Sequence, residues 1–95
     1  MAPLDADEVQ RRLAEHHGWT VHAGKLHREF AFADFVTAFG FMARVALVAE
    51  RMNHHPEWSN VYGKVVVDLV THDARGITHK DFELAAAMDR FAAAP

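Results

Sequence analysis

The sequence contains no cysteine, and this absence removes several kinds of site at once. Disulfides, thiolate catalysis and zinc sites built from cysteine are all excluded. The 95 residues also contain no apolar run long enough to span a membrane, and the N-terminus lacks the basic pattern of a leader peptide. We therefore expect a soluble cytoplasmic protein that forms a single domain over residues 1–95.

Clustered positive charge is missing as well. The formal net charge is −3, and the 10 lysine and arginine residues form no patch along the chain. Proteins that bind nucleic acid through electrostatics need such a patch, so direct binding to nucleic acid is not expected. The sequence is 51% hydrophobic and 24% charged, which is typical of a small globular domain.

Capping residues and apolar periodicity predict three helices. The first begins after Asp5 and ends near Gly18, and the second begins after Asp34 and runs to about Met52. The third begins at Thr78 with a second capping box. Each helix has an apolar face, so each is expected to pack against a common core.

Alternating segments between these helices predict two β-hairpins. Residues 19–22 and 25–32 form the first, and residues 57–62 and 64–71 form the second around Gly63. The order is then αββαββα. We expect an α+β fold in which the hairpins form one four-stranded antiparallel sheet with the helices packed on one face.

The central helix is apolar over more of its circumference than one sheet can cover. Its polar positions, such as Thr37 and Arg44, fall along one narrow stripe that Arg51 continues. In a small chain, such an arc favours a second partner, and we interpret it as a subunit interface.

The end of this helix is the first place to look for chemistry. The chain there reads Glu50, three residues, His54, His55 and Pro56. The residue before a proline is pushed out of the helical conformation, so His55 is expected to be extended at the rim of the fold. Imidazole has the unperturbed pKa nearest neutrality, so such side chains can exchange protons at working pH.

Other histidines are distributed along the chain. His72 follows the last predicted strand, so it lies, like the histidine pair, in a connection where binding groups concentrate. Position alone leaves open whether these three histidines share a site or are unrelated surface residues. The histidines in or beside the first helix and hairpin are interpreted as solvated surface residues: His16, His17, His22 and His27.

A metal site is one alternative for the histidines that follow the helix. It would use His54, His55, His72 and Glu50 as ligands. Adjacent residues in an extended segment point to opposite faces, which makes chelation by the histidine pair awkward. The metal alternative is therefore disfavoured.

Fixed spacings link this segment to the rest of the C-terminal half. The pattern is Glu50, three residues, His54-His55-Pro56, five residues, Tyr62, nine residues, His72, eight residues and Asp81. This spacing resembles the signature of the pterin-4a-carbinolamine dehydratases. The stretches 39–46, 54–58 and 71–76 resemble that family too, and the resemblance is weakest in the first helix.

The resemblance implies an enzyme. Family members dehydrate 4a-hydroxytetrahydropterin, the by-product of aromatic amino-acid hydroxylases, to quinonoid dihydropterin, which a separate reductase recycles to tetrahydropterin. They need no metal and no organic cofactor, have the αββαββα fold, and form dimers or tetramers. The sequence leaves open which pterin side chain is used and which assembly forms.

The same resemblance implies roles for the three histidines of this pattern. His54 and His72 correspond to an acid/base pair, and His55 chiefly holds the pterin and is a further candidate for proton transfer. Which histidine protonates the leaving hydroxyl group stays open. Glu50 is expected to orient a histidine or to stabilise an imidazolium ion, with a solvated helix-end carboxylate as the alternative.

Further residues are expected around the substrate. Pro56 and Trp58 are expected to shape the pocket wall, although Trp58 fits a core role equally well. Lys80 stands where relatives often carry a basic residue, and it is expected to help close the pocket. Asp81 belongs to the signature, but the capping box of the last helix also explains it. Asn53 departs from the family, in which an acidic residue is common.

A binding module is the alternative function from another class. The resembling family includes members that dock onto a transcription factor or assist protein assembly with little catalysis. The apolar arc of the central helix suits such a partner. All three histidines are present, however, and a protein retained only for binding is free to lose them, so the sequence favours the enzyme.

Overall fold

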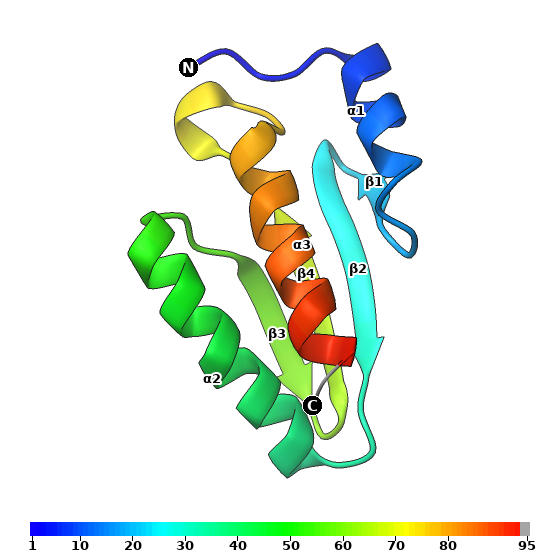
Figure 1. Cartoon of the computed structure of the whole chain (residues 1–95), viewed down its shortest axis with the longest axis vertical. Coiled ribbons are helices and arrows are strands. Elements are labelled where there is room, and N and C mark those ends of the chain that lie inside the picture. The colour runs from blue at the N-terminus through cyan, green and yellow to red at the C-terminus, as the bar shows by residue number, and fades with distance from the viewer. Residues whose placement is uncertain (94–95) are drawn as a thin grey trace.

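The computed structural model describes residues 1–93 and has the predicted order of elements (Figure 1). A short 3-10 helix, η1, adds to the three helices and four strands. The elements are α1 (Ala6–Leu13), β1 (Thr20–His22), β2 (Lys25–Ala31), α2 (Phe35–Met52), β3 (Glu57–Val61), β4 (Lys64–Leu69), η1 (His72–Ala74) and α3 (His79–Ala93).

The four strands form one antiparallel sheet in the order β1-β2-β4-β3. The β1–β2 turn has Ala23 and Gly24 at φ values of 52° and 77°, as a two-residue turn matched to the strand twist requires. β2 pairs with β4, so Leu26 lies opposite Leu69 and His27 opposite Asp68. The predicted α+β fold with αββαββα order is confirmed.

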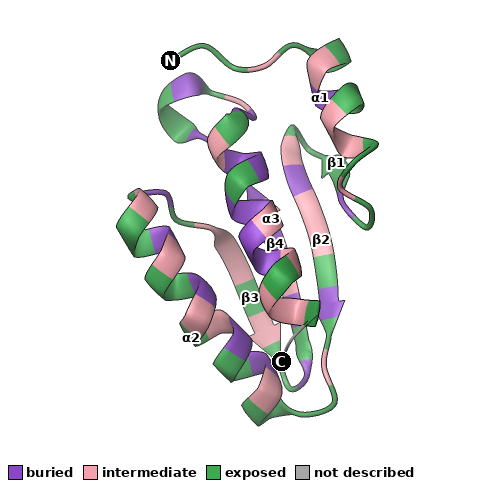
Figure 2. Ribbon diagram, in the orientation of Figure 1, coloured by how far each residue is buried: buried purple, intermediate pink, exposed green. Residues whose placement is uncertain are grey.

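The core lies between one face of the sheet and the helices α2 and α3, which both cover that face (Figure 1). On β4, Val65, Val67 and Leu69 are fully buried, whereas Val66 and Asp68 between them are only partly buried. Buried and lighter segments also follow one another along β2 in Figure 2. Burying one strand face and leaving the other wetter is the expected outcome of period-2 patterning.

Arg28 interrupts the apolar face of β2, and the structure explains it. Its guanidinium group lies 4.5 Å above the Phe30 ring, and its Nη1 donates to Asp89 Oδ1 at 2.9 Å. Trp19 Nε1 donates to the same carboxylate at 2.9 Å. The polar interruptions of β2 and of α3 therefore satisfy each other inside an otherwise apolar layer.

Two sequence-based expectations for the N-terminal region were wrong. α1 ends at Leu13, earlier than the predicted end near Gly18, because the chain tightens into turns that are closed by bonds such as His16 N–H to Leu13 O. The early histidines are also not all solvated. The His16 ring packs 5.2 Å from the Phe82 ring, and half-buried His27 contacts a carboxylate.

The structure also bears on membrane insertion. Within residues 1–93, no helix combines the length and the apolar character that crossing a bilayer requires.

Candidate active site

Asn53 ends α2 and sets the direction of the histidine pair. It adopts the left-handed conformation, with φ 52° and ψ 44°. Its N–H bonds to Glu50 O at 3.1 Å, and the N–H of His54 bonds back to Ala49 O at 3.0 Å, which is a Schellman motif. Asparagine is one of the few side chains that adopt this conformation readily. The helix therefore ends at Asn53, three residues before Pro56.

His54 turns inward from this helix end. Only 8% of the residue is exposed, and its Nε2 lies 2.6 Å from Oδ1 of Asp81, which is fully buried in the first turn of α3. A carboxylate oxygen only accepts hydrogen bonds, so Nε2 of His54 carries a proton. Nδ1 is then the ring nitrogen that remains to exchange a proton.

Two threonines complete the bonds to the buried carboxylate. Oδ2 of Asp81 accepts from the Thr71 hydroxyl and from the Thr78 N–H, both at 2.9 Å. Because the Thr71 proton is used there, the Thr78 hydroxyl donates to Thr71 Oγ1 at 2.7 Å, and Lys80 N–H donates to Thr78 at 3.2 Å. The helix-capping role and the histidine-binding role of Asp81 therefore coexist in one network.

His72 lies at the start of η1, in a much more open setting. Its Nε2 is 2.9 Å from Oε2 of Glu57, and the other carboxylate oxygen, Oε1, accepts from Lys25 Nζ at 2.5 Å. Lys25, and after it His72, hold the pKa of Glu57 below its ordinary value, and Glu57 in turn raises the pKa of Lys25. Glu57 therefore stays charged over a wide pH range and holds His72 from one side.

His55 follows the same arrangement at the surface. Its Nε2 is 2.7 Å from Oε1 of Glu50, and both side chains are exposed, at 58% and 81%. The predicted orienting contact between Glu50 and a histidine is present, and its partner is His55.

A pocket of about 170 Å³ brings the three histidines together. Its lining comes from three stretches of the chain: residues 53–55 just after α2, residues 70–73 that follow β4 and enter η1, and residue 80 in the first turn of α3. The lining residues are Asn53, His54, His55, Val70, Thr71, His72, Asp73 and Lys80.

The remaining predicted site residues lie around this pocket and not in its lining. Asp81 is behind His54, and Glu50 is on the outer side of His55. Pro56 is partly exposed at the approach to β3. Trp58 lies on β3 opposite Val67 and packs against the hydrophobic core. The substrate contacts expected of Pro56 and Trp58 stay predictions.

Several residues of the site are not singled out by the sequence. The pattern predicts Glu57 as the first residue of a strand, Val70 and Thr71 as the end of the next strand and Asp73 as a loop residue, although each lies beside or close to a predicted site residue. Asn53 was noted only as a departure from the family. An asparagine one residue past the last helical turn is the signal that could have identified a left-handed cap.

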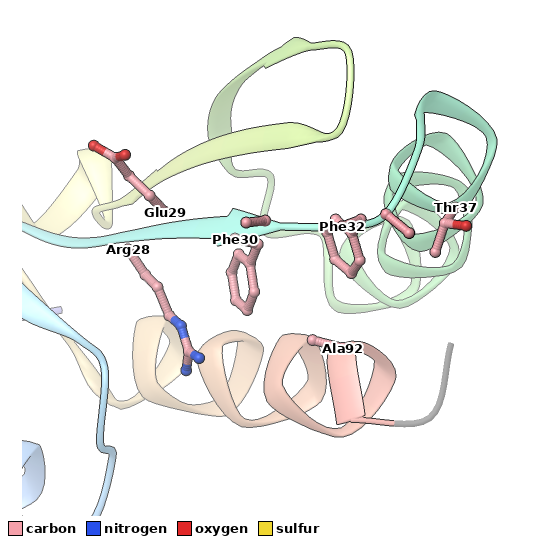
Figure 3. A pocket seen from close by; sticks show the side chains of 8 residues that line it. Arg28, Glu29, Phe30, Phe32, Thr37 and Ala92 are labelled. Atoms are coloured by element: carbon pink, nitrogen blue, oxygen red, sulfur yellow. The ribbon is translucent and has the colours of Figure 1, made fainter.

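A larger cavity lies elsewhere in the described part of the chain. About 620 Å³ opens between the far half of β2, the start of α2 and the end of α3, where Arg28, Phe30 and Phe32 point toward α3 (Figure 3). No histidine lines it, and Arg28 is already paired with Asp89. The smaller pocket is therefore the one that brings three imidazoles together.

The ring nitrogens of the described pocket histidines do not converge on one point. Within residues 1–93, the only group of three histidine or acidic side chains with converging ligand atoms is His22, His27 and Asp68, on the outer face of the sheet. In the pocket, the Nε2 atom of each histidine lies within hydrogen-bonding distance of a different carboxylate.

Comparison with known proteins shows which family the chain belongs to. The profile of the family described as pterin 4 alpha carbinolamine dehydratase matches residues 2–91. A protein from Solibacter usitatus with a provisional pterin-4-alpha-carbinolamine dehydratase name is 61% identical over 90 residues, which are 95% of each chain. A similarly named protein from Rhodospirillum rubrum is 52% identical and covers 92% of this chain and 93% of its own.

Solved structures extend the comparison to three dimensions. The crystal structure of a transcriptional coactivator/pterin dehydratase from Brucella melitensis superposes with a TM-score of 0.92 at 43% identity, over 95% of this chain and 98% of that one. A pterin dehydratase-like RuBisCO assembly factor of the alpha-carboxysome shares the fold, with a TM-score of 0.69 at 22% identity over 84% and 95% of the chains. With a family match over nearly its whole length, this chain belongs to the pterin 4 alpha carbinolamine dehydratase family.

Proposed function

We propose that this protein dehydrates 4a-hydroxytetrahydropterin to quinonoid dihydropterin and water by histidine acid/base catalysis. The observation that carries the proposal is the pocket itself, in which three imidazoles gather and each has its Nε2 within 2.6–2.9 Å of a carboxylate. A carboxylate on one ring nitrogen fixes the tautomer and stabilises the imidazolium ion that forms during proton transfer.

The reaction needs both an acid and a base. A carbinolamine carries a hydroxyl group on the carbon next to an amine nitrogen. Elimination breaks the C–O bond, the departing oxygen takes a proton and leaves as water, and the nitrogen loses its proton as the C=N double bond forms. No electrons are exchanged with a cofactor, so two imidazoles of opposite protonation state are sufficient.

His54 and His72 are the proposed acid/base pair. They line the same pocket from the segment just after α2 and from η1, and the Nε2 of each lies within hydrogen-bonding distance of a carboxylate, so Nδ1 is the nitrogen that serves the substrate.

The other pocket residues are proposed to bind the substrate. His55 presents an exposed imidazole that is held by Glu50, and Lys80 lies across the pocket at the start of α3. The ammonium group of Lys80 suits the carbonyl and polar ring nitrogens of a pterin. In this role, the protein acts on the pterin product of an aromatic amino-acid hydroxylase, and its own product is the substrate of a reductase.

The test is a stopped-flow dehydration assay on variants that preserve hydrogen bonding. Replacing His54 or His72 by glutamine keeps an N–H close to the position of Nε2, so the carboxylate partner keeps its donor while the base is removed. We expect each variant to lose about 10²–10⁴-fold in kcat. Wild-type rates in both variants, with unchanged circular dichroism, would contradict the proposal.

A second proposal concerns the surface of α2. Four of its large apolar side chains are strongly exposed in the single chain: Phe35 at 48%, Val36 at 79%, Phe39 at 57% and Leu47 at 72%. We propose that this face forms the contact between copies of the chain in a homodimer or homotetramer, since an apolar surface of this kind marks an interaction site.

A non-catalytic binding function is the competing use of the same face. It is favoured by the same exposed side chains, and the solved relatives include proteins titled as a transcriptional coactivator and as an assembly factor. Light scattering separates the two uses. Wild type is expected to be oligomeric, and Val36→Asp with Leu47→Asp is expected to give monomers, whereas a monomeric wild type would favour a different partner.

A further inference from the structure

The outer face of the sheet carries a group of side chains that the proposed dehydration does not use. Figure 3 shows Glu29 on the opposite side of β2 from Arg28 and Phe30, so odd-numbered residues of β2 face away from the helices. His27 belongs to this outer face, and it meets side chains from the strand on either side.

Three strands deliver one ligand each. The Nδ1 of His27 lies 2.9 Å from Oδ1 of Asp68, directly opposite on β4. On the other side, His22 of β1 packs its ring 5.3 Å from the His27 ring. One ligand atom from each of His22, His27 and Asp68 lies within 4.8 Å of the others. Because all three side chains start from paired strands, their Cα positions are fixed by the sheet.

The charges around the group favour a cation. The neighbouring carboxylates of Glu57 and Glu29 are each paired with a lysine, at 2.5 Å with Lys25 and at 3.2 Å with Lys64. The carboxylate of Asp68 contacts Nδ1 of the His27 imidazole at 2.9 Å, and Glu29 Oε2 lies 3.7 Å from Nε2 of the same ring. One carboxylate together with two imidazoles is a donor set that a borderline-soft divalent metal prefers.

We propose that His22, His27 and Asp68 form a binding site for a divalent transition-metal ion of the zinc class, separate from the histidine pocket. Tetrahedral zinc with ligand bonds of about 2.0–2.2 Å needs donor atoms roughly 3.3 Å apart. Since His22 is exposed at the end of β1, rotation of its side chain closes the remaining gap. Water fills the fourth position.

The metal would act as a clip. β1 is only three residues long, all exposed, and it pairs with β2 alone. A metal bridging β1, β2 and β4 ties this edge strand to the centre of the sheet. Binding to the folded state alone then raises the melting temperature in proportion to the logarithm of the free metal concentration.

Calorimetric titration with zinc chloride tests the site. The wild-type protein is expected to bind one equivalent saturably. His22→Gln is expected to weaken binding at least about tenfold, and His22→Gln with His27→Gln to weaken it further. His17→Gln is the matched control, because His17 is an exposed histidine outside the group, and it is expected to bind as wild type. Circular dichroism checks that each variant is folded.

A second variant distinguishes this site from the histidine pocket. His55→Gln with His72→Gln removes two pocket imidazoles and is expected to leave zinc affinity unchanged. The proposal is overturned if that variant loses zinc binding, if the His22 and His27 double variant binds as wild type, or if wild type shows no saturable binding. Each of these results is obtained without measuring dehydration, so the outcome does not depend on the proposed enzymatic function.

Discussion

Two histidine–carboxylate pairs face the same pocket from very different surroundings. The His54–Asp81 pair is enclosed, with side chains 9% and 0% exposed, and the His72–Glu57 pair is open, at 73% and 39%. Their Nε2–oxygen distances are similar, at 2.6 and 2.9 Å. The local geometry is therefore alike, and the difference lies in what surrounds each pair.

Because of this difference, the two pairs are expected to contribute differently to the stability of the fold and to catalysis. Asp81 joins three segments, the end of α2, the end of β4 and the start of α3, so its loss disturbs the fold as well as the site. Glu57 holds His72, which is exposed, and Lys25, which is partly exposed, and ion pairs this close to solvent contribute little to stability. The buried pair is expected to combine structural and catalytic roles, and the open pair to be mainly catalytic.

Removing the buried carboxylate is expected to have the largest effect. Asp81→Ala leaves the His54 ring, the Thr71 hydroxyl and the Thr78 N–H without their acceptor. We expect unfolding free energy to fall by about 3–5 kcal/mol, measured by urea denaturation. Asp81→Asn keeps one acceptor oxygen and serves as the milder control. A loss of unfolding free energy below about 1 kcal/mol in the alanine variant would contradict the structural role of Asp81.

Removing the open imidazole is expected to affect chemistry alone. His72→Gln should lower kcat by about 10²-fold or more while changing unfolding free energy by less than about 0.5 kcal/mol, because a surface substitution costs little. Stopped-flow kinetics and urea denaturation on the same preparation measure both. An exposed histidine outside the pocket, replaced in His17→Gln, is the matched control and should change neither quantity. A stability loss in His72→Gln comparable to that of Asp81→Ala would contradict the proposed difference between the buried and the open pair.

The helix end that positions the buried pair gives a smaller, graded test. Asn53 holds the left-handed conformation, which costs other residues with a Cβ roughly 1–2 kcal/mol. Asn53→Ala should therefore lower stability by about 1 kcal/mol and misplace His54, whereas Asn53→Gly should be at least as stable as wild type. Equal stability of the alanine and glycine variants, measured by thermal denaturation, would show that the cap does not set the helix end.

The open pair gives the smallest effect, and it depends on pH. The pKa of Glu57 is lowered below its ordinary 4.5, so its contribution to stability is present above that value and is lost as pH falls through the lowered pKa. The pKa of Lys25 is raised above 10.5, so its contribution is present below that value and is lost as pH rises through the raised pKa.

The two shifts together define a window. The stability difference between wild type and Glu57→Gln should be largest between pH 4.5 and 10.5 and should vanish toward both extremes. Because these side chains are exposed, the difference should be no more than about 1 kcal/mol. Urea denaturation across the pH range measures it, and a difference that persists in strong acid would contradict the ion-pair account.

Much of this fold follows from local signals. Asp5 and Asp34 cap their helices as their positions predict, and each N-cap carboxylate accepts from the backbone N–H three residues later. The two hairpins and the alternation along β4 also follow from period-2 patterning. These features depend on residues that are close in sequence, which is why they can be read directly.

Contacts that support the site from other segments cannot be predicted from local signals. The contact between Lys25 and Glu57 spans 32 positions and exists only because β2 and β3 both pair with β4. The bond from Thr71 to Asp81 depends on how η1 folds back between β4 and α3. The spacing pattern contains the histidines together with Glu50 and Asp81, whereas Glu57, the partner of His72, is placed by strand order and register, which no local pattern reports.

The central claim is that the two pairs act together as acid and base. Stopped-flow dehydration of 4a-hydroxytetrahydropterin by the His54→Gln and His72→Gln double variant tests it most directly. We predict a folded protein whose rate falls to that of the uncatalysed reaction. A folded double variant that dehydrates the substrate at the wild-type rate would contradict the account.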